Sequence, residues 1–321
     1  MNPRADSLRA FAVQAVVALA ALFLAAPGRA QVAIYHVQGN VYMLAGDGGN
    51  ITVQVGKEGV LMVDTGFAPM AGQVMAEIQK LTPAPLLFIV NTHAHPDHVG
   101  GNDAFAKMVP EGQAELAGGR AGFQPLKIIA HGNVLNRMTS GDSASHPGLP
   151  QDEYFTPFKD LRLNGEAIVI YHEPNAHTDG DSIVLFRGSD VISTGDIFTP
   201  GGYPFLDVER GGSVQGEIAA LNHILDLTVP GKTQEGGTYV IPGHGRICDE
   251  ADVVEFRDML VIVRDRIRDM IRKGMTLDQI KAARPTEDYD TEYVNTASFV
   301  KADQFVEAVY RSLAAKQGSS R

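Results

Sequence analysis

The sequence predicts an α/β protein in which two β-sheets pack against each other and carry helices on their outer faces. Short apolar segments separated by glycines indicate many strands, and each half of the chain has strands followed by a helix. The segment Leu86–Val90 is apolar throughout, which is typical of a strand covered on both faces. Two strand-rich halves that each carry helices therefore predict two packed sheets.

The first half is predicted to begin with an antiparallel meander. Its four strands are Val32–Val37, Val41–Leu44, Asn50–Val55 and Val60–Val63. A helix is predicted over Met70–Lys80, because two prolines end it before the strand Leu86–Val90. Further along, we expect a strand at Lys127–Ala130 and a helix at Val134–Met138. The stretch Ser140–Leu163 is rich in Pro, Ser, Gly and Asp, and is predicted to be a long surface loop.

The second half is predicted to repeat the order of strands and then helices. Its expected strands are Ala167–Tyr171, Ser182–Phe186, Val191–Ser193 and Tyr239–Ile241. Apolar residues at steps of three and four predict helices at Val214–Leu227 and Asp252–Lys273, and a last helix is expected over Ser298–Ala314. We expect these C-terminal helices, from about residue 252, to cover the sandwich.

The first 30 residues have the layout of a secretory signal peptide. Arg4 and Arg9 precede the apolar run Phe11–Ala26, and Gly28 and Ala30 provide the small residues of a cleavage site. The alternative is an uncleaved membrane anchor, but the run of about 16 residues is short for a bilayer span of roughly 20. We expect a secreted or periplasmic domain of residues 31–321 that has no stable membrane association after cleavage.

Composition excludes several classes of protein. The net charge is −11 and basic residues do not cluster, which argues against a nucleic-acid partner. Cys248 is the single cysteine, so neither an intrachain disulfide nor a thiolate metal cluster can form, and we expect a buried thiol. A small-molecule substrate is the expected partner, and the sequence does not indicate the oligomeric state.

Imidazole and carboxylate groups gather after the predicted strands. They lie in turns and strand ends, where a sheet presents functional side chains at one rim, and they are the ligand types of zinc and similar divalent ions. The candidate metal ligands are His93, His95, Asp97, His98, His177, Asp196 and His244.

The spacing of these residues predicts two ions. His93 and His95 are two residues apart, so in an extended segment they point the same way. Asp97 and His98 follow a proline that turns the chain, and they are expected to reach a second ion about 3.5–4 Å from the first. The other histidines lack such partners. We expect His131 and His172 to be structural, and His36, His146 and His223 to lie at the surface. Asp179 and Asp181 are interpreted as turn residues.

The motifs resemble those of the metallo-β-lactamase superfamily, over nearly all of the chain after residue 30. They occur in the superfamily's order: Val63-Asp64-Thr65-Gly66, Asn91-Thr92-His93-Ala94-His95-Pro96-Asp97-His98, Ala176-His177-Thr178, Thr194-Gly195-Asp196 and Pro242-Gly243-His244-Gly245. The resemblance implies a four-layer αβ/βα sandwich. It also implies one ion on His93, His95 and His177, a second on Asp97, His98 and His244, and Asp196 as a bridge. Asp64 in this superfamily supports the ligand loop.

The expected activity is that of a hydrolase with two zinc ions. Such ions lower the pKa of a shared water toward about 7, and we expect the resulting hydroxide to attack a carbonyl carbon. Asp97 is the expected catalytic residue, which orients the nucleophile and passes a proton to the leaving group. A Gly-x-Ser-x-Gly serine-nucleophile motif does not occur in the chain.

The residues that follow the metal motifs bear on the substrate. An aspartate at position 196 is similar to glyoxalase II and lactonase-like members, whereas known β-lactamases carry Cys or Ser there. Thr199 stands where some β-lactamases have a lysine for the drug carboxylate. The export signal argues against a glutathione thioester, because that substrate is mainly cytoplasmic. The substrate classes that remain open are β-lactam-like compounds, lactones and thioesters. The loops Thr199–Gly212 and Ser140–Leu163 are candidate pocket walls.

Two alternatives keep the fold and change the function. An iron-dependent oxidoreductase or sulfur dioxygenase is the first, because a carboxylate bridge also suits iron or manganese. A binding protein without turnover is the second, but no ligand position is missing from the motifs.

Overall fold

The computed structural model describes residues 31–109, 126–140, 148–233, 236–294 and 299–318. The predicted signal peptide lies outside these residues, as does His146. Residues Gln31–Arg321 form one compact unit. Within the described residues, no helix combines the length and the apolar character that a membrane span requires.

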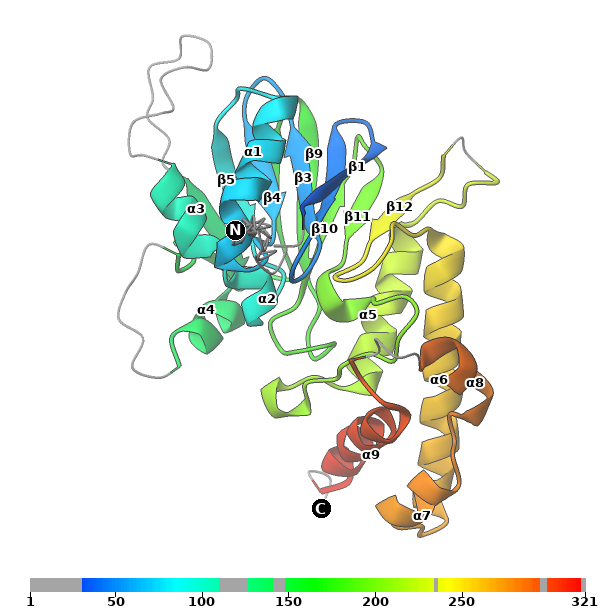
Figure 1. Cartoon of the computed structure of the whole chain (residues 1–321). Helices are drawn as coiled ribbons and strands as arrows, with labels where there is room; N and C mark the ends of the chain where they lie inside the picture. The colour runs from blue at the N-terminus through cyan, green and yellow to red at the C-terminus, as the bar shows by residue number, and fades with distance from the viewer. Residues whose placement is uncertain (1–30, 110–125, 141–147, 234–235, 295–298, 319–321) are drawn as a thin grey trace, which may run out of the picture. The chain divides into compact units, whose positions relative to one another are not determined.

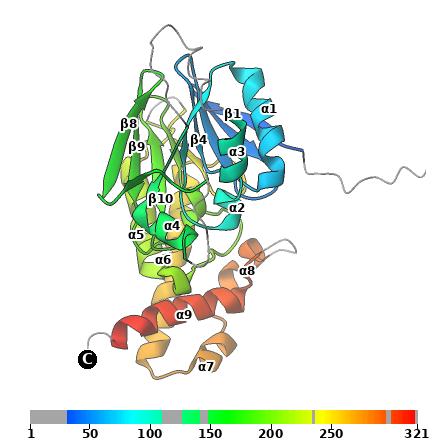
Figure 2. The same cartoon turned by 90° about the vertical axis from the view of Figure 1, so that its left-hand side faces the viewer.

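The unit has four layers, as the sequence predicted, with two sheets in the middle and helices on both outer faces (Figure 1, Figure 2). The first sheet has seven strands in chain order, β1 to β7, and the second has five strands in the order β12-β11-β10-β9-β8. The first sheet contains β1 (Ala33–Gln38), β2 (Val41–Ala45), β3 (Ile51–Val55), β4 (Val60–Val63), β5 (Leu86–Val90), β6 (Lys127–His131) and β7 (Asp152–Tyr154). The second contains β8 (Phe158–Leu163), β9 (Glu166–His172), β10 (Ser182–Phe186), β11 (Val191–Ser193) and β12 (Tyr239–Ile241).

The pairing of the strands changes along the first sheet. β1 to β4 form the predicted antiparallel meander, and β4 to β7 are parallel to one another. A parallel pair needs a connection that crosses back over the sheet, and α1 (Ala71–Leu81) provides it between β4 and β5. The carboxyl ends of β4, β5 and β6 therefore lie at one edge of the sheet.

Apolar side chains fill three interfaces between the layers. Val53, Met62 and Ile89 of the first sheet pack with Val74 and Ile78 of α1. A second cluster, which includes side chains from both sheets, lies between the sheets. The third cluster joins the second sheet to three helices, α5 (Val214–Leu227), α6 (Glu250–Arg272) and α9 (Ala302–Gly318).

Polar residues also lie between the sheets. β3 alternates apolar and polar residues, yet all of its side chains are buried. Thr52 donates a hydrogen bond to Ser193 at 2.9 Å, and Gln54 donates one to Glu166 at 2.6 Å, both across the interface. Because each polar group has a partner in the opposite sheet, its burial is not costly.

The prediction of a loop over Ser140–Leu163 was wrong for its second part, which contains β7 and β8. Both are edge strands of their sheets. β8 carries Lys159, Asp160 and Arg162 and alternates exposed with more buried residues. Charged residues protect an exposed edge from pairing with another chain, and here they give the strand the composition of a loop.

Short helices were also missing from the prediction. They are α2 (Pro96–Val99), α3 (Asn102–Met108), α7 (Leu277–Ala282) and α8 (Glu287–Tyr293). Each is at most seven residues long, too short to show a helical period. One local signal did exist, because Thr276 and Gln279 form a capping box at the start of α7.

Candidate metal centre

The structure brings all seven predicted ligands together at one rim of the two sheets. His93 and His95 follow β5, and Asp97 and His98 lie in α2, which begins at Pro96. The second sheet supplies the other three residues: His177 between β9 and β10, Asp196 after β11, and His244 after β12. The site therefore depends on the packing of the two sheets.

The ligating atoms form two groups. His93, His95, His177 and Asp196 make one group and Asp97, His98 and His244 make the other, with the ligand atoms of each group within 4.8 Å of one another. Within the second group, Nε2 of His244 lies 3.2 Å from Oδ2 of Asp97. This division matches the one that the sequence resemblance implies.

The carboxylate of Asp196 lies between the two groups. Its Oδ2 is 3.8 Å from Nε2 of His93 and 3.7 Å from Nε2 of His177. Its Oδ1 is 3.1 Å from Nε2 of His98 and 3.5 Å from Nε2 of His244. Each oxygen thus faces a different group, as a bridging carboxylate requires.

Three buried polar atoms support a metal centre. Nε2 of His93, Nε2 of His98 and Oδ1 of Asp196 are buried and have no hydrogen-bond partner among the described residues. Buried polar atoms without partners are rare in native proteins, and a bound ion is a common explanation for them. Imidazole and carboxylate donors fit zinc and related divalent ions, so the residues present fit a metal.

Asp64 orients the ligands of both groups. It lies just after β4 in a left-handed conformation, with φ of 61°. Its carboxylate accepts hydrogen bonds from Nδ1 of His98 at 2.7 Å and from the amide and hydroxyl of Thr92 at 2.8 and 2.7 Å. The Thr92 hydroxyl in turn accepts from Nδ1 of His93 at 3.0 Å. Both imidazoles therefore hold a proton on Nδ1 and direct Nε2 at the centre, the tautomer that a metal ligand requires.

A segment after Asp196 orients the remaining ligands of the first group. Nε2 of His95 donates to Oδ2 of Asp207 at 2.9 Å, which leaves Nδ1 facing Nε2 of His177 at 2.9 Å. Nδ1 of His177 donates to the backbone carbonyl of Phe205. Sequence reasoning missed Asp207, because no motif marks it and its partner His95 is 112 residues away.

The protonation equilibria agree with metal ligation. Burial lowers the pKa of His93 well below its usual range and that of His177 to about 4, so both are neutral. Burial also lowers the pKa of His98, but the carboxylates of Asp196 and Asp64 outweigh it and the net shift is upward. The surrounding imidazoles hold the pKa of Asp196 well below its usual range despite its burial. A divalent cation would replace the proton of His98.

Two glycines allow the chain to pass close to the ligands. A Cβ at Gly49 would lie 2.4 Å from the ring of His98, and one at Gly243 would lie 2.0 Å from Oδ1 of Asp196. Larger residues at these positions would displace the ligands themselves.

The metal groups face a cavity of about 830 Å³. Its walls include Thr199–Tyr203, Phe205 and Arg210, so the predicted wall Thr199–Gly212 does line the site. None of the described residues 148–163 lines this cavity, so that part of the second candidate wall was misplaced. The cavity is completed instead by Phe299 and Val300, which lie three and two residues before the start of α9 in the C-terminal region.

Several other residues lie where the sequence predicted. The rings of His131 and His172 stack with centroids 3.5 Å apart, and neither belongs to the metal groups. Cys248 is buried. His36 is exposed, whereas His223 is partly buried and pairs with Glu173 at 2.6 Å, so its assignment to the surface holds only in part.

Comparisons with known proteins extend these observations. A family model of the metallo-beta-lactamase superfamily matches residues 44–244. A linear primary-alkylsulfatase of Pseudomonas sp. (strain ATCC 19151) is 39% identical over an alignment of 258 residues, and the match covers 70% of this chain and 47% of the relative. The chain thus spans about half the length of this curated relative.

Solved structures share the fold at low sequence identity. The stereoselective inverting sec-alkylsulfatase of Pseudomonas sp. superposes with a TM-score of 0.64 at 17% identity, over 87% of this chain and 50% of that one. The metallo-beta-lactamase of Pontibacter korlensis superposes with a TM-score of 0.55 at 14% identity, over 72% of this chain and 99% of that one. With the family match across the metal motifs, these findings show that the chain belongs to the metallo-beta-lactamase superfamily.

Proposed function

We propose that this metal-dependent hydrolase binds two zinc ions and opens a carbonyl substrate such as a lactone, a thioester or a β-lactam-like ring. The observation that carries the proposal is the position of Asp196, whose two oxygens face two separate groups of ligands. The proposed ligands are His93, His95 and His177 for one ion and Asp97, His98 and His244 for the other. Iron or manganese would also suit these donors.

Two ions in these groups would supply an activated water at neutral pH and polarise the scissile bond. The chain's own contribution is proton transfer by Asp97. Burial raises the pKa of Asp97, but its hydrogen bond with His244 and the nearby His98 outweigh burial, so the pKa is lowered and the carboxylate is ionised. Asp97 lines the cavity, where it would accept a proton from the attacking water and return it to the leaving group.

A second candidate reaction is the hydrolysis of a sulfate ester. The similarity to an alkylsulfatase favours it, as does Arg210, which lines the cavity, pairs with Asp207 at 2.7 Å and has a side chain that is about half exposed. Arginine binds planar and tetrahedral anions through several N–H donors. An oxidoreductase that uses iron is a third candidate. A single observation favours it, the carboxylate of Asp196 between the two groups of ligands.

We also propose that the protein acts outside the cytoplasm, in the periplasm or the medium. The proposal rests on the basic, apolar and small-residue segments of residues 1–30. N-terminal sequencing of protein recovered from the periplasm would test it, and a mature N-terminus at Gln31 is expected.

Metal analysis and a substrate panel test the proposed reaction. Protein purified without added metal is expected to hold close to two zinc ions, and the metal-replete enzyme is expected to hydrolyse a lactone, thioester or β-lactam. Asp97→Asn should lower kcat by about 100-fold or more, the usual size of a proton-transfer contribution. Asp160→Asn, at an exposed carboxylate of β8, is the matched control.

The same panel separates the candidates. Turnover of alkyl sulfates without turnover of carbonyl substrates would replace the first candidate with the second. Stoichiometric iron with no hydrolysis would favour the oxidoreductase. Wild-type activity of Asp97→Asn on every substrate would refute the role of Asp97.

A further inference from the structure

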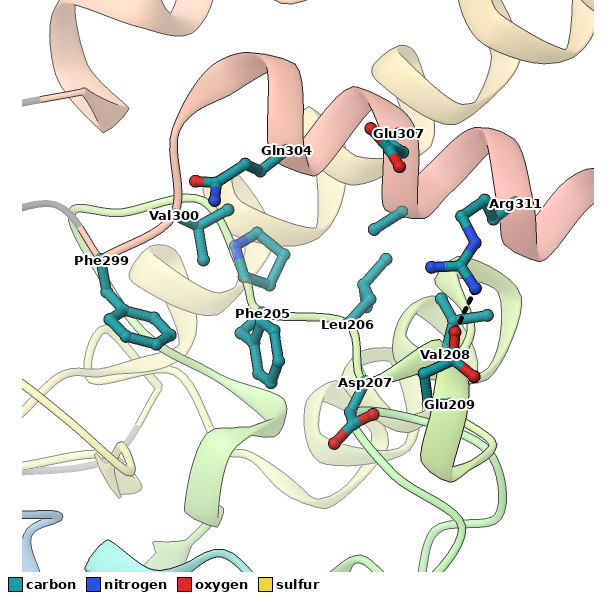
Figure 3. A pocket seen from close by; sticks show the side chains of 12 residues that line it. Phe205, Leu206, Asp207, Val208, Glu209, Phe299, Val300, Gln304, Glu307 and Arg311 are labelled. Carbon is teal, nitrogen blue, oxygen red and sulfur yellow. Dashed lines mark hydrogen bonds and ion pairs between the residues drawn. The ribbon is translucent and has the colours of Figure 1, made fainter. Parts of the chain in front are cut away.

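A second cavity of about 470 Å³ lies beside the metal cavity. One wall is the segment 204–209, and the other is formed by the first part of α9 together with Phe299 and Val300 (Figure 3). We call this cavity the side pocket. Its apolar wall residues include Phe205, Leu206, Val208, Phe299, Val300 and Ala308.

The side pocket and the metal cavity are neighbours that share a wall. Phe205, Phe299 and Val300 line both of them. The rings of Phe205 and Phe299 meet edge to face with centroids 5.8 Å apart, and Figure 3 shows them at the same end of the side pocket. The two side chains are 43% and 83% exposed. Large exposed aromatic groups at the mouth of an active site are typical of a surface that an apolar ligand covers.

Charged side chains close the other end of the side pocket. Glu209 and Arg311 form an ion pair there, drawn as a dashed line in Figure 3. Asp207 and Glu307 also line the side pocket. Each of these carboxylates pairs with a basic side chain, Asp207 with Arg210 at 2.7 Å and Glu307 with Lys281 at 2.6 Å. Because the charges are already paired, the apolar part of the walls is free to contact an apolar ligand. A chain of methylene groups needs no hydrogen bond from the walls, whereas a polar ligand would lose its hydration there.

The wall of the side pocket is also the segment that orients the first group of metal ligands. The carbonyl of Phe205 accepts a hydrogen bond from His177, and Asp207 accepts one from His95. A chain lying along this segment therefore ends next to the metal ligands. Its position is suited to the remote part of a molecule whose reactive group is at the metal centre.

We propose that the side pocket binds an apolar alkyl or acyl chain of the substrate, so that the enzyme selects amphiphilic substrates by chain length. The inference rests on the proposed function for the reactive group, which occupies the metal cavity. A fully buried methylene contributes roughly fourfold to binding. In a half-open pocket, an increase in kcat/KM of about twofold for each methylene is expected until the chain reaches the Glu209–Arg311 pair.

The first experiment measures hydrolysis of p-nitrophenyl esters from acetate to decanoate by the zinc-loaded enzyme, below the micelle concentration of each. The second measures binding of the alkyl carboxylates from acetate to decanoate by calorimetry, and needs no turnover. Decanoate is expected to bind at least about tenfold more tightly than butanoate.

Ala308→Phe fills the side pocket and is expected to lower the ratio of kcat/KM for decanoate over acetate esters by about tenfold. Asp303→Phe adds the same ring on α9 outside the side pocket and should leave the ratio unchanged. Chain-length-dependent binding that Ala308→Phe abolishes, without ester hydrolysis, would support the side pocket and count against a carbonyl substrate. Binding that is independent of chain length, or equal in Ala308→Phe and wild type, would overturn the inference.

Discussion

Replacing Asp64 by asparagine is expected to weaken the metal centre without changing any proposed ligand. Asn keeps the size of the side chain and tolerates the left-handed backbone at this position, where φ is 61°. Its amide oxygen can accept the hydrogen bonds of one carboxylate oxygen, but its NH₂ group is a donor and cannot accept those of the other. If Oδ1 stays on the Thr92 amide, an NH₂ group faces Nδ1 of His98, which lies 2.7 Å from Oδ2 of Asp64.

Two donors then face each other, and His98 must move its proton to Nε2. That atom is the one directed at the centre and without a hydrogen-bond partner among the described residues, so the ring is left in the wrong tautomer for ligation. Loss of a hydrogen bond to a charged group costs about 1.5–3 kcal/mol. This range corresponds to a loss of metal affinity of about 10- to 100-fold, the usual effect of removing such a supporting residue.

The measurement is a titration of metal-free protein with zinc in the presence of a competing chelator. Affinity for the ion held by His98 should fall by 10- to 100-fold in Asp64→Asn, and affinity for the other ion should fall less. Circular dichroism establishes that the variant is folded, and Asp160→Asn is the matched control. If folded Asp64→Asn bound both ions within twofold of the wild-type affinity, the tautomer argument would be wrong.

Three further predictions concern the metal, a buried acid and the thiol. A chelator should remove the proposed zinc and lower Tm by about 5–10 °C, since saturation at 100 times Kd contributes about 2.7 kcal/mol and each kcal/mol is about 2–4 °C; an unchanged Tm would contradict a structural contribution of the metal. Both carboxylate oxygens of Glu217 are buried without a hydrogen-bond partner among the described residues, and burial raises its pKa well above the usual range. A carboxyl whose pKa is raised by folding lowers the stability of the folded protein as pH rises above the pKa of the unfolded chain. Glu217→Gln should therefore raise Tm more at pH 8 than at pH 5. Equal changes in Tm at the two pH values would contradict this. Burial raises the pKa of Cys248 to about 12, so a thiol reagent should label it only after unfolding.

Much of the fold was predictable because its strands and longer helices carry strong local patterns. The meander β1–β4, the strand β5 and the helices α1, α5 and α6 all lie within a few residues of the predicted ranges. Their apolar residues repeat with the period of the element they form, which is a property of the chain itself. The edge strands β7 and β8 lacked that property, because what makes them strands is pairing with β6 and β9.

The candidate ligand set could be proposed from the sequence for a different reason. A metal requires particular donor atoms, and the spacing of His93, His95, Asp97 and His98 places four of them within six residues. The residues that orient these donors have no such signature. Any carboxylate or carbonyl that reaches the second ring nitrogen serves, so Asp207 and the carbonyl of Phe205 were visible only once the chain was folded.

The sequence by itself therefore determined the four-layer architecture, the family and the seven residues of the candidate metal centre. The tertiary structure decided how Asp196 divides its oxygens between two groups, which atoms hold the imidazole tautomers, and which walls surround the substrate. The physical reason is distance along the chain: Phe205 and Phe299 form one mouth of the side pocket, although 94 positions separate their numbers in the sequence. Contacts of that kind are fixed by the packing of whole layers and leave no local pattern.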